Sequence, residues 1–168
     1  LNVNRRNANL RMYEVGNCYA FVADKASEEN ALAKYEESYR IGITVTGLKT
    51  QLAWNSKEEA SSFFTLRGIV ERLLKRFGVD LYTLQCESLD CDLYADAIVF
   101  KQGPKEVVRM GVVSPIVRKK FDIKQEVYFA EIDFDQLIKM TKKAKVQFKE
   151  ISKFPEVKRD LALLVNKD

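Results

Sequence analysis

The sequence predicts an α+β fold, in which an antiparallel β-sheet carries a long helix on one face. Three observations support this class. Short β-rich runs recur along the chain and end at turn residues. A single long segment has apolar residues at helical spacing. Consecutive strands are joined by a hairpin-like turn, which implies antiparallel pairing. The 168 residues, 46% hydrophobic and 31% charged, are enough for one core.

The first expected strand is Arg11–Phe21, where Tyr13, Val15, Tyr19 and Phe21 recur in period two and therefore share a face. The sequence favours a place for both tyrosines in the core. The alternative is that they anchor a partner chain.

The segment that follows the first strand is charged, and the second expected strand comes after it. Ala23–Ser38 is expected to be loop with some helix. The β-branched run Tyr39–Gly47 predicts the second strand, which ends at its glycine. Trp54 lies in a polar stretch, and we expect it to cover the core.

The long helix is predicted within FTLRGIVERLLKRFG. Its apolar stripe consists of Leu66, Ile69, Val70, Leu73, Leu74 and Phe77. Lys75 and Arg76 suit the last turn, and Gly78 stands where a glycine ends a helix. We expect the stripe to pack on the core, with a partner-binding face as the alternative. Gly68 costs helix stability, so a close contact with another element is expected there.

Short elements fill the second half of the chain. Strands are expected at Leu81–Cys86, Ala95–Lys101, Val107–Val113, Glu126–Asp133 and Leu161–Val165, with a hairpin turn at Gln102–Glu106. Short helices are expected at Ser114–Phe121, which opens with Ser-Pro, and at Phe134–Ala144.

The residue types exclude several kinds of active site. The chain contains no histidine, so it cannot build a Ser-His-Asp or Cys-His mechanism. Three cysteines, Cys18, Cys86 and Cys91, form no CxxC pair, and we expect neither a disulfide framework nor a metal site. No GxGxxG or GxxxxGK[ST] loop is present to cradle phosphate. The carboxylate pairs Asp90/Asp92 and Glu131/Asp133 are interpreted as solvated strand edges.

The charge of the chain is uneven. Residues 139–168 hold nine basic and four acidic side chains, which gives a net charge of +5. The rest of the chain holds 19 basic and 20 acidic side chains, which gives a net charge of −1. This excess, including Lys142, Lys143 and Lys145, suggests an RNA-binding surface as one hypothesis. A solvated helix face followed by a polar linker is the favoured alternative. No apolar run is long enough for a membrane span, and the start resembles no signal peptide, so a cytoplasmic location is expected.

Four collinear stretches resemble the β chain of bacterial phenylalanyl-tRNA synthetases. They are NVNRRNANLRMYEVGNCYAF, the segment from Trp54 through FFTLRGIVERLLKRFG, RMGVVSPIVRKKFDIKQEVYFAEIDFDQLI, and SKFPEVKRDLALLV. They match, in order, the family patterns "N…R…lrlFEiGrvy", "W…dFfdlKG.ve.ll..lg", "iG.lhP.v...fdi...v...Eidl..l" and "s.fP.v.RDla.vv". Together they cover most of the chain.

The resemblance implies a class II synthetase-like core over residues 1–151. Residues 152–168 are then a linker and the first strand of a ferredoxin-like anticodon-binding domain. The implied function is that of a β subunit of phenylalanine–tRNA ligase, an enzyme that uses ATP and magnesium to attach phenylalanine to tRNA-Phe. In the family, the catalytic α chain binds phenylalanine and ATP, and the subunits form an α2β2 heterotetramer. This region of β is implied to be a non-catalytic scaffold that packs on α.

The sequence departs from a working class II site, because neither the fRxE signature nor a GxGxGxxR-like motif is present. The family's histidine-containing stretches are replaced by LDCDLYADAIVF and by Val113–Pro115. No residue is therefore assigned a catalytic, cofactor-binding or metal-binding role. The expected subunit interface comprises Asn4, Arg5, Arg6, Arg11 and Tyr13, which follow a motif-1-like helix. A stand-alone RNA-binding module that uses the basic C-terminal stretch is the alternative function.

Overall fold

A computed structural model describes residues 7–22, 34–142, 150, 153–154 and 157–162. Its strands are β1 (Leu10–Phe21), β2 (Tyr35–Thr46), β3 (Leu48–Thr50), β4 (Glu59–Ala60), β5 (Gln85–Ser88), β6 (Tyr94–Gln102), β7 (Lys105–Val113) and β8 (Val127–Asp133). Its helices are α1 (Phe63–Arg76), α2 (Pro115–Lys120) and α3 (Phe134–Thr141), with a 3-10 turn at Leu81–Thr83. The predicted α+β class is confirmed.

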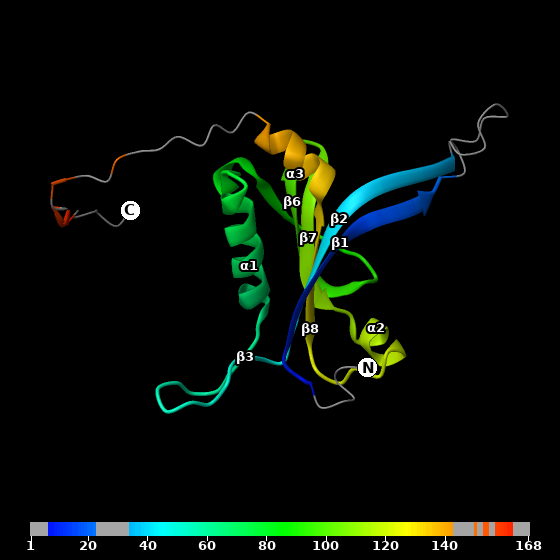
Figure 1. The fold of residues 1–168 in the computed structure, drawn as a ribbon, viewed down its shortest axis with the longest axis horizontal. Coiled ribbons are helices and arrows are strands. Elements are labelled where there is room, and N and C mark those ends of the chain that lie inside the picture. Colours follow the sequence, from blue (N-terminus) through cyan, green and yellow to red (C-terminus); the bar gives the residue numbers. More distant parts are fainter. Residues whose placement is uncertain (1–6, 23–33, 143–149, 151–152, 155–156, 163–168) are drawn as a thin grey trace, which may run out of the picture.

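Six strands form one antiparallel sheet in the order β1-β2-β8-β7-β6-β5. The late strand β8 lies between β2 and β7, so the two halves of the chain share one sheet. Helices α1 and α3 lie on the same side of it, and the β1–β2 ribbon extends past the sheet (Figure 1). Strands β3 and β4 pair separately, near the N-terminal end of α1.

The core lies between α1, α3 and the sheet. Its fully buried side chains include Leu66, Val70 and Leu74 from α1, Leu137 from α3, and Val45, Val108, Met110 and Ile132 from the sheet. Each buried aliphatic side chain contributes roughly 1.5–3 kcal/mol relative to its exposed state. The predicted core role of the α1 stripe is therefore confirmed for its buried members.

The ends of α1 follow from its flanking residues. At the start, the backbone N–H of Ser62 donates to the Thr65 hydroxyl over 3.1 Å. At the end, Gly78 has φ +79°, a conformation that glycine adopts without steric cost. Lys75 and Arg76 occupy the last turn, where positive charge complements the helix dipole. The predicted end of the helix just before Gly78 is confirmed.

Several predictions about single residues are wrong. Tyr13 and Tyr19 are 79% and 69% exposed. Tyr13 lies on β1, the edge strand of the sheet, and Tyr19 lies where the β1–β2 ribbon runs past the residues that pair with β8. Trp54 is 97% exposed and covers no core, since the turn that bears it projects outward. Gly68 makes no close contact, because a Cβ added there meets no atom within 4 Å.

Some predicted boundaries also differ. Strand β2 begins at Tyr35, inside the segment expected to be loop, because the ribbon pairing with β1 continues to Phe21. The expected strand Leu81–Cys86 is a 3-10 turn followed by β5. The Asp80 carboxylate accepts the Tyr82 N–H and so favours that turn. Of the expected strand Leu161–Val165, Leu161 and Ala162 have no regular structure, and the rest lies outside the described residues.

None of the helices in the described ranges is long and apolar enough to cross a bilayer.

Candidate functional site

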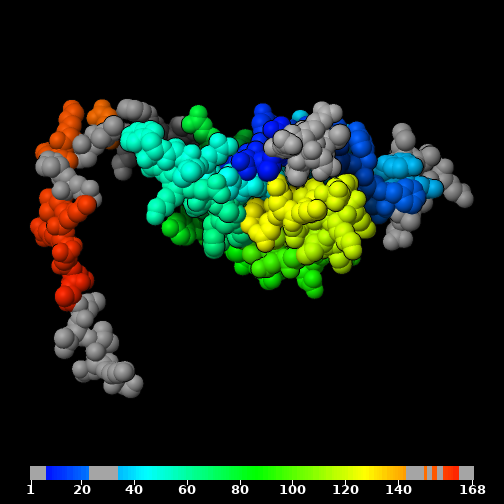
Figure 2. All heavy atoms as spheres, turned by 90° about the horizontal axis from the view of Figure 1, so that it is seen from below, coloured from blue at the N-terminus to red at the C-terminus, as the bar shows by residue number. Residues whose placement is uncertain are grey.

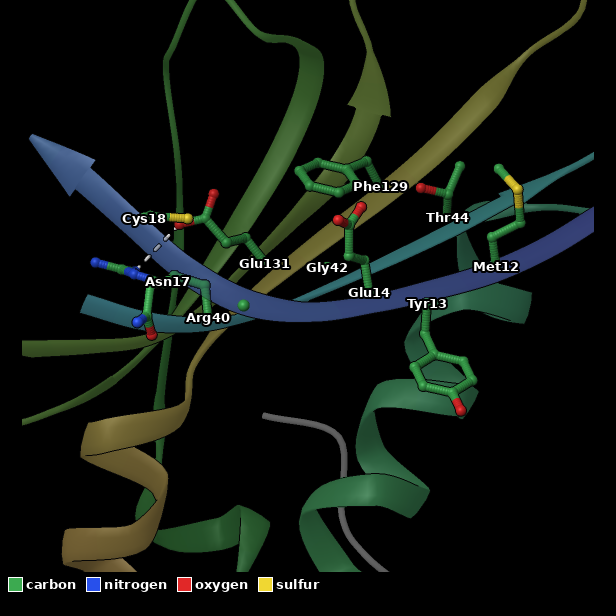
Figure 3. A pocket seen from close by; sticks show the side chains of 11 residues that line it. Met12, Tyr13, Glu14, Asn17, Cys18, Arg40, Gly42, Thr44, Phe129 and Glu131 are labelled. Carbon is green, nitrogen blue, oxygen red and sulfur yellow. Dashed lines mark ion pairs between the residues drawn. The ribbon is translucent and has the colours of Figure 1, made fainter. Parts of the chain in front are cut away.

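The β1–β2 ribbon has a hollow on each of its faces. The first, the open-face pocket, lies on the side of the sheet away from α1 and α3 and has a volume of about 490 Å³ (Figure 3). It is lined by Met12, Tyr13, Glu14, Gly16, Asn17, Cys18, Arg40, Gly42, Thr44, Phe129 and Glu131. The period-two alternation of β1, β2 and β8 places most of these side chains on one face.

Arg40 is the charged residue around which the other polar groups of the open-face pocket are arranged. Its guanidinium lies 3.1 Å from Glu131 and 3.6 Å from Asp133, both on β8. Its Nε also donates to the Ser38 hydroxyl over 3.1 Å. Because β8 is a central strand, Glu131 and Asp133 are not the solvated strand edge that the sequence suggested. They share a face as expected, and Arg40 bridges them.

The charges in the open-face pocket disfavour a nucleotide. Arg40 is the single cation among its described lining residues, and Glu14 and Glu131 are anions. Polyphosphates bind where cationic side chains or glycine-rich backbone amides are free to reach their oxygens. Here the cation is already held by two carboxylates. The described lining of the pocket therefore lacks a free cation that could bind phosphate.

Tyr94 lies close to the same charges but is buried. Its hydroxyl has no hydrogen-bond partner in the described part of the chain. Burial is the main cause that raises the pKa of the Tyr94 phenol far above its usual value, and Glu131 adds to the rise while Arg109 opposes it. The phenol is therefore neutral at ordinary pH and is unsuited to act as a base.

Tyr94 packs there because residue 111 is glycine. A Cβ on Gly111 would lie 2.8 Å from the Tyr94 ring and 2.6 Å from Ala97 Cβ, and it would also overlap the Asp96 carbonyl oxygen. Only glycine permits this approach of β6 to β7. The arrangement is one of packing, and no reacting group is brought forward by it.

The second hollow, which we call the apolar groove, lies between the ribbon, α1 and the start of α3, and has a volume of about 910 Å³. Its lining comprises Arg11, Met12, Tyr13, Val15, Tyr39, Ile41, Ile43, Val45, Ile69, Arg72, Leu73, Arg76, Phe77 and Phe134. The Tyr13 ring points toward α1, away from the open face (Figure 3). Apolar side chains form its floor, and three arginines form its rim.

Comparison with known proteins decides the family. Residues 1–134 match the family described as "Phenylalanyl tRNA synthetase beta chain CLM domain". The chain belongs to the phenylalanyl-tRNA synthetase β-chain family. It is 46% identical over 168 residues to the phenylalanine–tRNA ligase β subunit of Bacteroides thetaiotaomicron, and 39% identical over 167 residues to that of Porphyromonas gingivalis. Each alignment covers 99% of the chain, which spans about a fifth of the length of these relatives.

Solved structures support the fold of this β-chain family member. A pyrrolysyl tRNA synthetase from Desulfitobacterium hafniense aligns with a TM-score of 0.54 at 14% identity. The alignment covers 87% of this chain and 49% of that one. At this identity the likeness concerns the fold alone, and it confirms the expected class II synthetase-like sheet.

The structure brings together two of the interface residues predicted from the family resemblance. Arg11 and Tyr13 both line the apolar groove. Asn4, Arg5 and Arg6 lie outside the described residues. Of the lysines predicted to face RNA, Lys142 is exposed at the end of α3, whereas Lys143 and Lys145 lie outside the described residues. The described residues give the RNA-binding hypothesis no support.

Sequence reasoning missed the residues that give both hollows their charge. Arg76 was expected only as a basic residue of the last helical turn, and Arg72 was given no role, although their i, i+4 spacing is a signal that they share a side of α1. Arg40 carried no signal, because its partners come from a strand more than 90 positions later in this β chain.

Proposed function

We propose that the chain is the synthetase-like core of the β subunit of a phenylalanine–tRNA ligase. In this role it is a non-catalytic scaffold that packs on the catalytic α subunit. The holoenzyme attaches phenylalanine to tRNA-Phe with ATP and magnesium, both held by α. The observation that carries the non-catalytic role is the pairing of Arg40 with Glu131 and Asp133, which leaves the open-face pocket without a cation for phosphate.

The proposal includes two parts of the chain. Residues 1–151 are the core domain, and residues 152–168 are a linker and the first strand of an anticodon-binding domain. Residues 157–162 lie apart from the sheet (Figures 1 and 2), and Val157 and Leu161 are 73% and 82% exposed. Exposed apolar residues outside regular structure suit a segment that packs against another part of the full-length β subunit.

The assembly we propose is an α2β2 heterotetramer in the cytoplasm, with tRNA-Phe contacted by other regions of the full-length β chain. Family membership supports the β role. The exposed apolar ribbon supports an association with another polypeptide.

Nucleotide titration tests the non-catalytic role. The full-length β subunit, free of α, is titrated with ATP and magnesium in a calorimeter, and the α–β complex is titrated in parallel. We expect saturable binding by the complex and none by β alone. Saturable ATP binding by β alone that is lost in Arg40→Met, but kept in the surface control Lys49→Met, would contradict the proposal.

A further inference from the structure

We infer that the apolar groove receives an amphipathic helix of the α subunit, with an apolar ridge and carboxylates at i and i+4. The inference rests on the proposed function and specifies the surface and the chemistry of its partner. The lining of the groove is mostly apolar and partly exposed. The floor includes Ile41 and Ile43, which are 8% and 7% exposed. On the wall, however, Tyr13 and Val15 are 79% and 42% exposed. An apolar surface of this kind marks an interaction site.

The described charged side chains of the groove are all basic, which suits an acidic partner. Arg11, Arg72 and Arg76 line the groove, and none of its described lining residues is acidic. Arg11 donates to the Lys49 carbonyl oxygen over 2.6 Å, and Arg72 donates to the Gly68 carbonyl oxygen over 3.0 Å. These neutral acceptors hold the side chains in place without cancelling their charge. A partner with carboxylates is therefore attracted and oriented.

The spacing of two of these arginines matches the repeat of a helix. Arg72 and Arg76 are four residues apart on α1, so their Cα atoms are separated by about 6 Å along the helix axis. Carboxylates at positions i and i+4 of a second helix have the same separation. Two charge-assisted pairs then form at once when the two helices lie side by side.

The backbone around the groove favours a helix over a strand as the occupant. The groove lies over α1 and one face of the sheet. The backbone of α1 bonds within the helix, and β1, although an edge strand, directs its unpaired N–H and C=O groups along the plane of the sheet and not into the groove. The groove therefore offers side-chain contacts and no main-chain ladder. A helix satisfies its own backbone and binds through one apolar face, which suits such a groove.

Site-specific cross-linking in the intact complex tests the occupant. A photoreactive phenylalanine derivative replaces Tyr13 in full-length β, which is co-expressed with the α subunit of the same genome. After irradiation, peptide mapping identifies the attached segment. We expect attachment to a helix of α. Attachment to another segment of β, attachment to a second β chain, or no attachment would each overturn the inference.

Charge reversal tests the arginine rim. Arg72→Glu with Arg76→Glu is expected to weaken association with α at least tenfold. Lys75→Glu is the matched control, because this exposed lysine is on the same turn but faces the hollow lined by Arg67 and Glu71. We expect the control to change the dissociation constant less than twofold. Equal effects of both variants, or no effect of the double variant, would overturn the inference.

The two proposals fail in different ways. If α and β form a complex but Tyr13 attaches only within β, the groove inference is wrong and the scaffold role stands. If no complex forms at all, both are wrong.

Discussion

Arg40 on β2 lies 3.1 Å from Glu131 on β8, two strands that meet although about 90 residues separate them in sequence. The same guanidinium is 3.6 Å from Asp133, so one cation is shared by two carboxylates on a central strand. All three side chains are half-buried, at 24%, 27% and 15% exposure. The arrangement joins the ribbon to the rest of the sheet, and it leaves the described lining of the open-face pocket with more carboxylates than cations.

Replacing Arg40 should therefore destabilise the chain. Arg40→Met leaves Glu131 and Asp133 close together without their cation, and we expect the free energy of unfolding to fall by about 1–2 kcal/mol. Urea denaturation measures this. Lys49→Met, which breaks an exposed pair with Glu59, is the control and should change stability by less than about 0.5 kcal/mol. Equal losses for the two variants would contradict the account.

The two buried tyrosines should respond in opposite directions when their hydroxyls are removed. Tyr94→Phe deletes a hydroxyl with no partner among the described residues, so stability should rise by about 1 kcal/mol. Tyr128→Phe deletes a hydroxyl that donates to the Glu126 carboxylate, so stability should fall by about 1 kcal/mol. Thermal and urea denaturation of both variants provide the comparison. A loss on Tyr94→Phe would show that its hydroxyl is bonded.

Alkaline pH should weaken the fold through the same two residues. Burial, with help from the bond to Glu126, raises the pKa of Tyr128 to about 12, and burial raises the pKa of Tyr94 as well. In the unfolded chain a tyrosine ionises near pH 10. The stabilisation is thus complete below about pH 10 and is lost as pH rises toward the folded pKa, at up to about 1.4 kcal/mol per pH unit for each tyrosine.

The measurement for this pH dependence is the free energy of unfolding at intervals between about pH 9 and 11.5. We expect Tyr128→Phe to have a shallower decline than the parent chain, because one of the two contributing groups is gone. An identical decline in parent and variant would refute the assignment.

Two glycines should respond oppositely to alanine. Gly111→Ala places a Cβ against Tyr94, Ala97 and the Asp96 carbonyl oxygen, and we expect a loss of roughly 1–3 kcal/mol. Gly68→Ala meets nothing within 4 Å and lies within α1, so stability should rise by up to about 1 kcal/mol. Chemical denaturation distinguishes them. A destabilising Gly68→Ala would reveal a contact that the structure does not show.

The parts of the fold that local pattern determines were predictable. The stripe from Leu66 to Phe77 and Gly78 predicted α1, because helix period and cap are local signals. The turn at Gln102–Glu106 and the helix after Ser114 followed from turn and cap chemistry.

The parts that depend on distant pairing were not predictable from local pattern. Tyr13 and Tyr19 have the same alternation as core residues, but they lie on the edge strand β1, where their side chains stay largely exposed. The Arg40 pairs required the knowledge that β8 inserts beside β2. Arg11 and Tyr13 were proposed from family resemblance, and their common place in the apolar groove emerged only from the structure.

The stoichiometry of the α–β complex tests the proposed scaffold role. The full-length β subunit is co-expressed with the α subunit of the same genome, purified through a tag on β, and weighed by light scattering. We expect a stoichiometric complex with the mass of two α and two β chains. A β chain that elutes without α, at the mass of a monomer, would contradict the scaffold role.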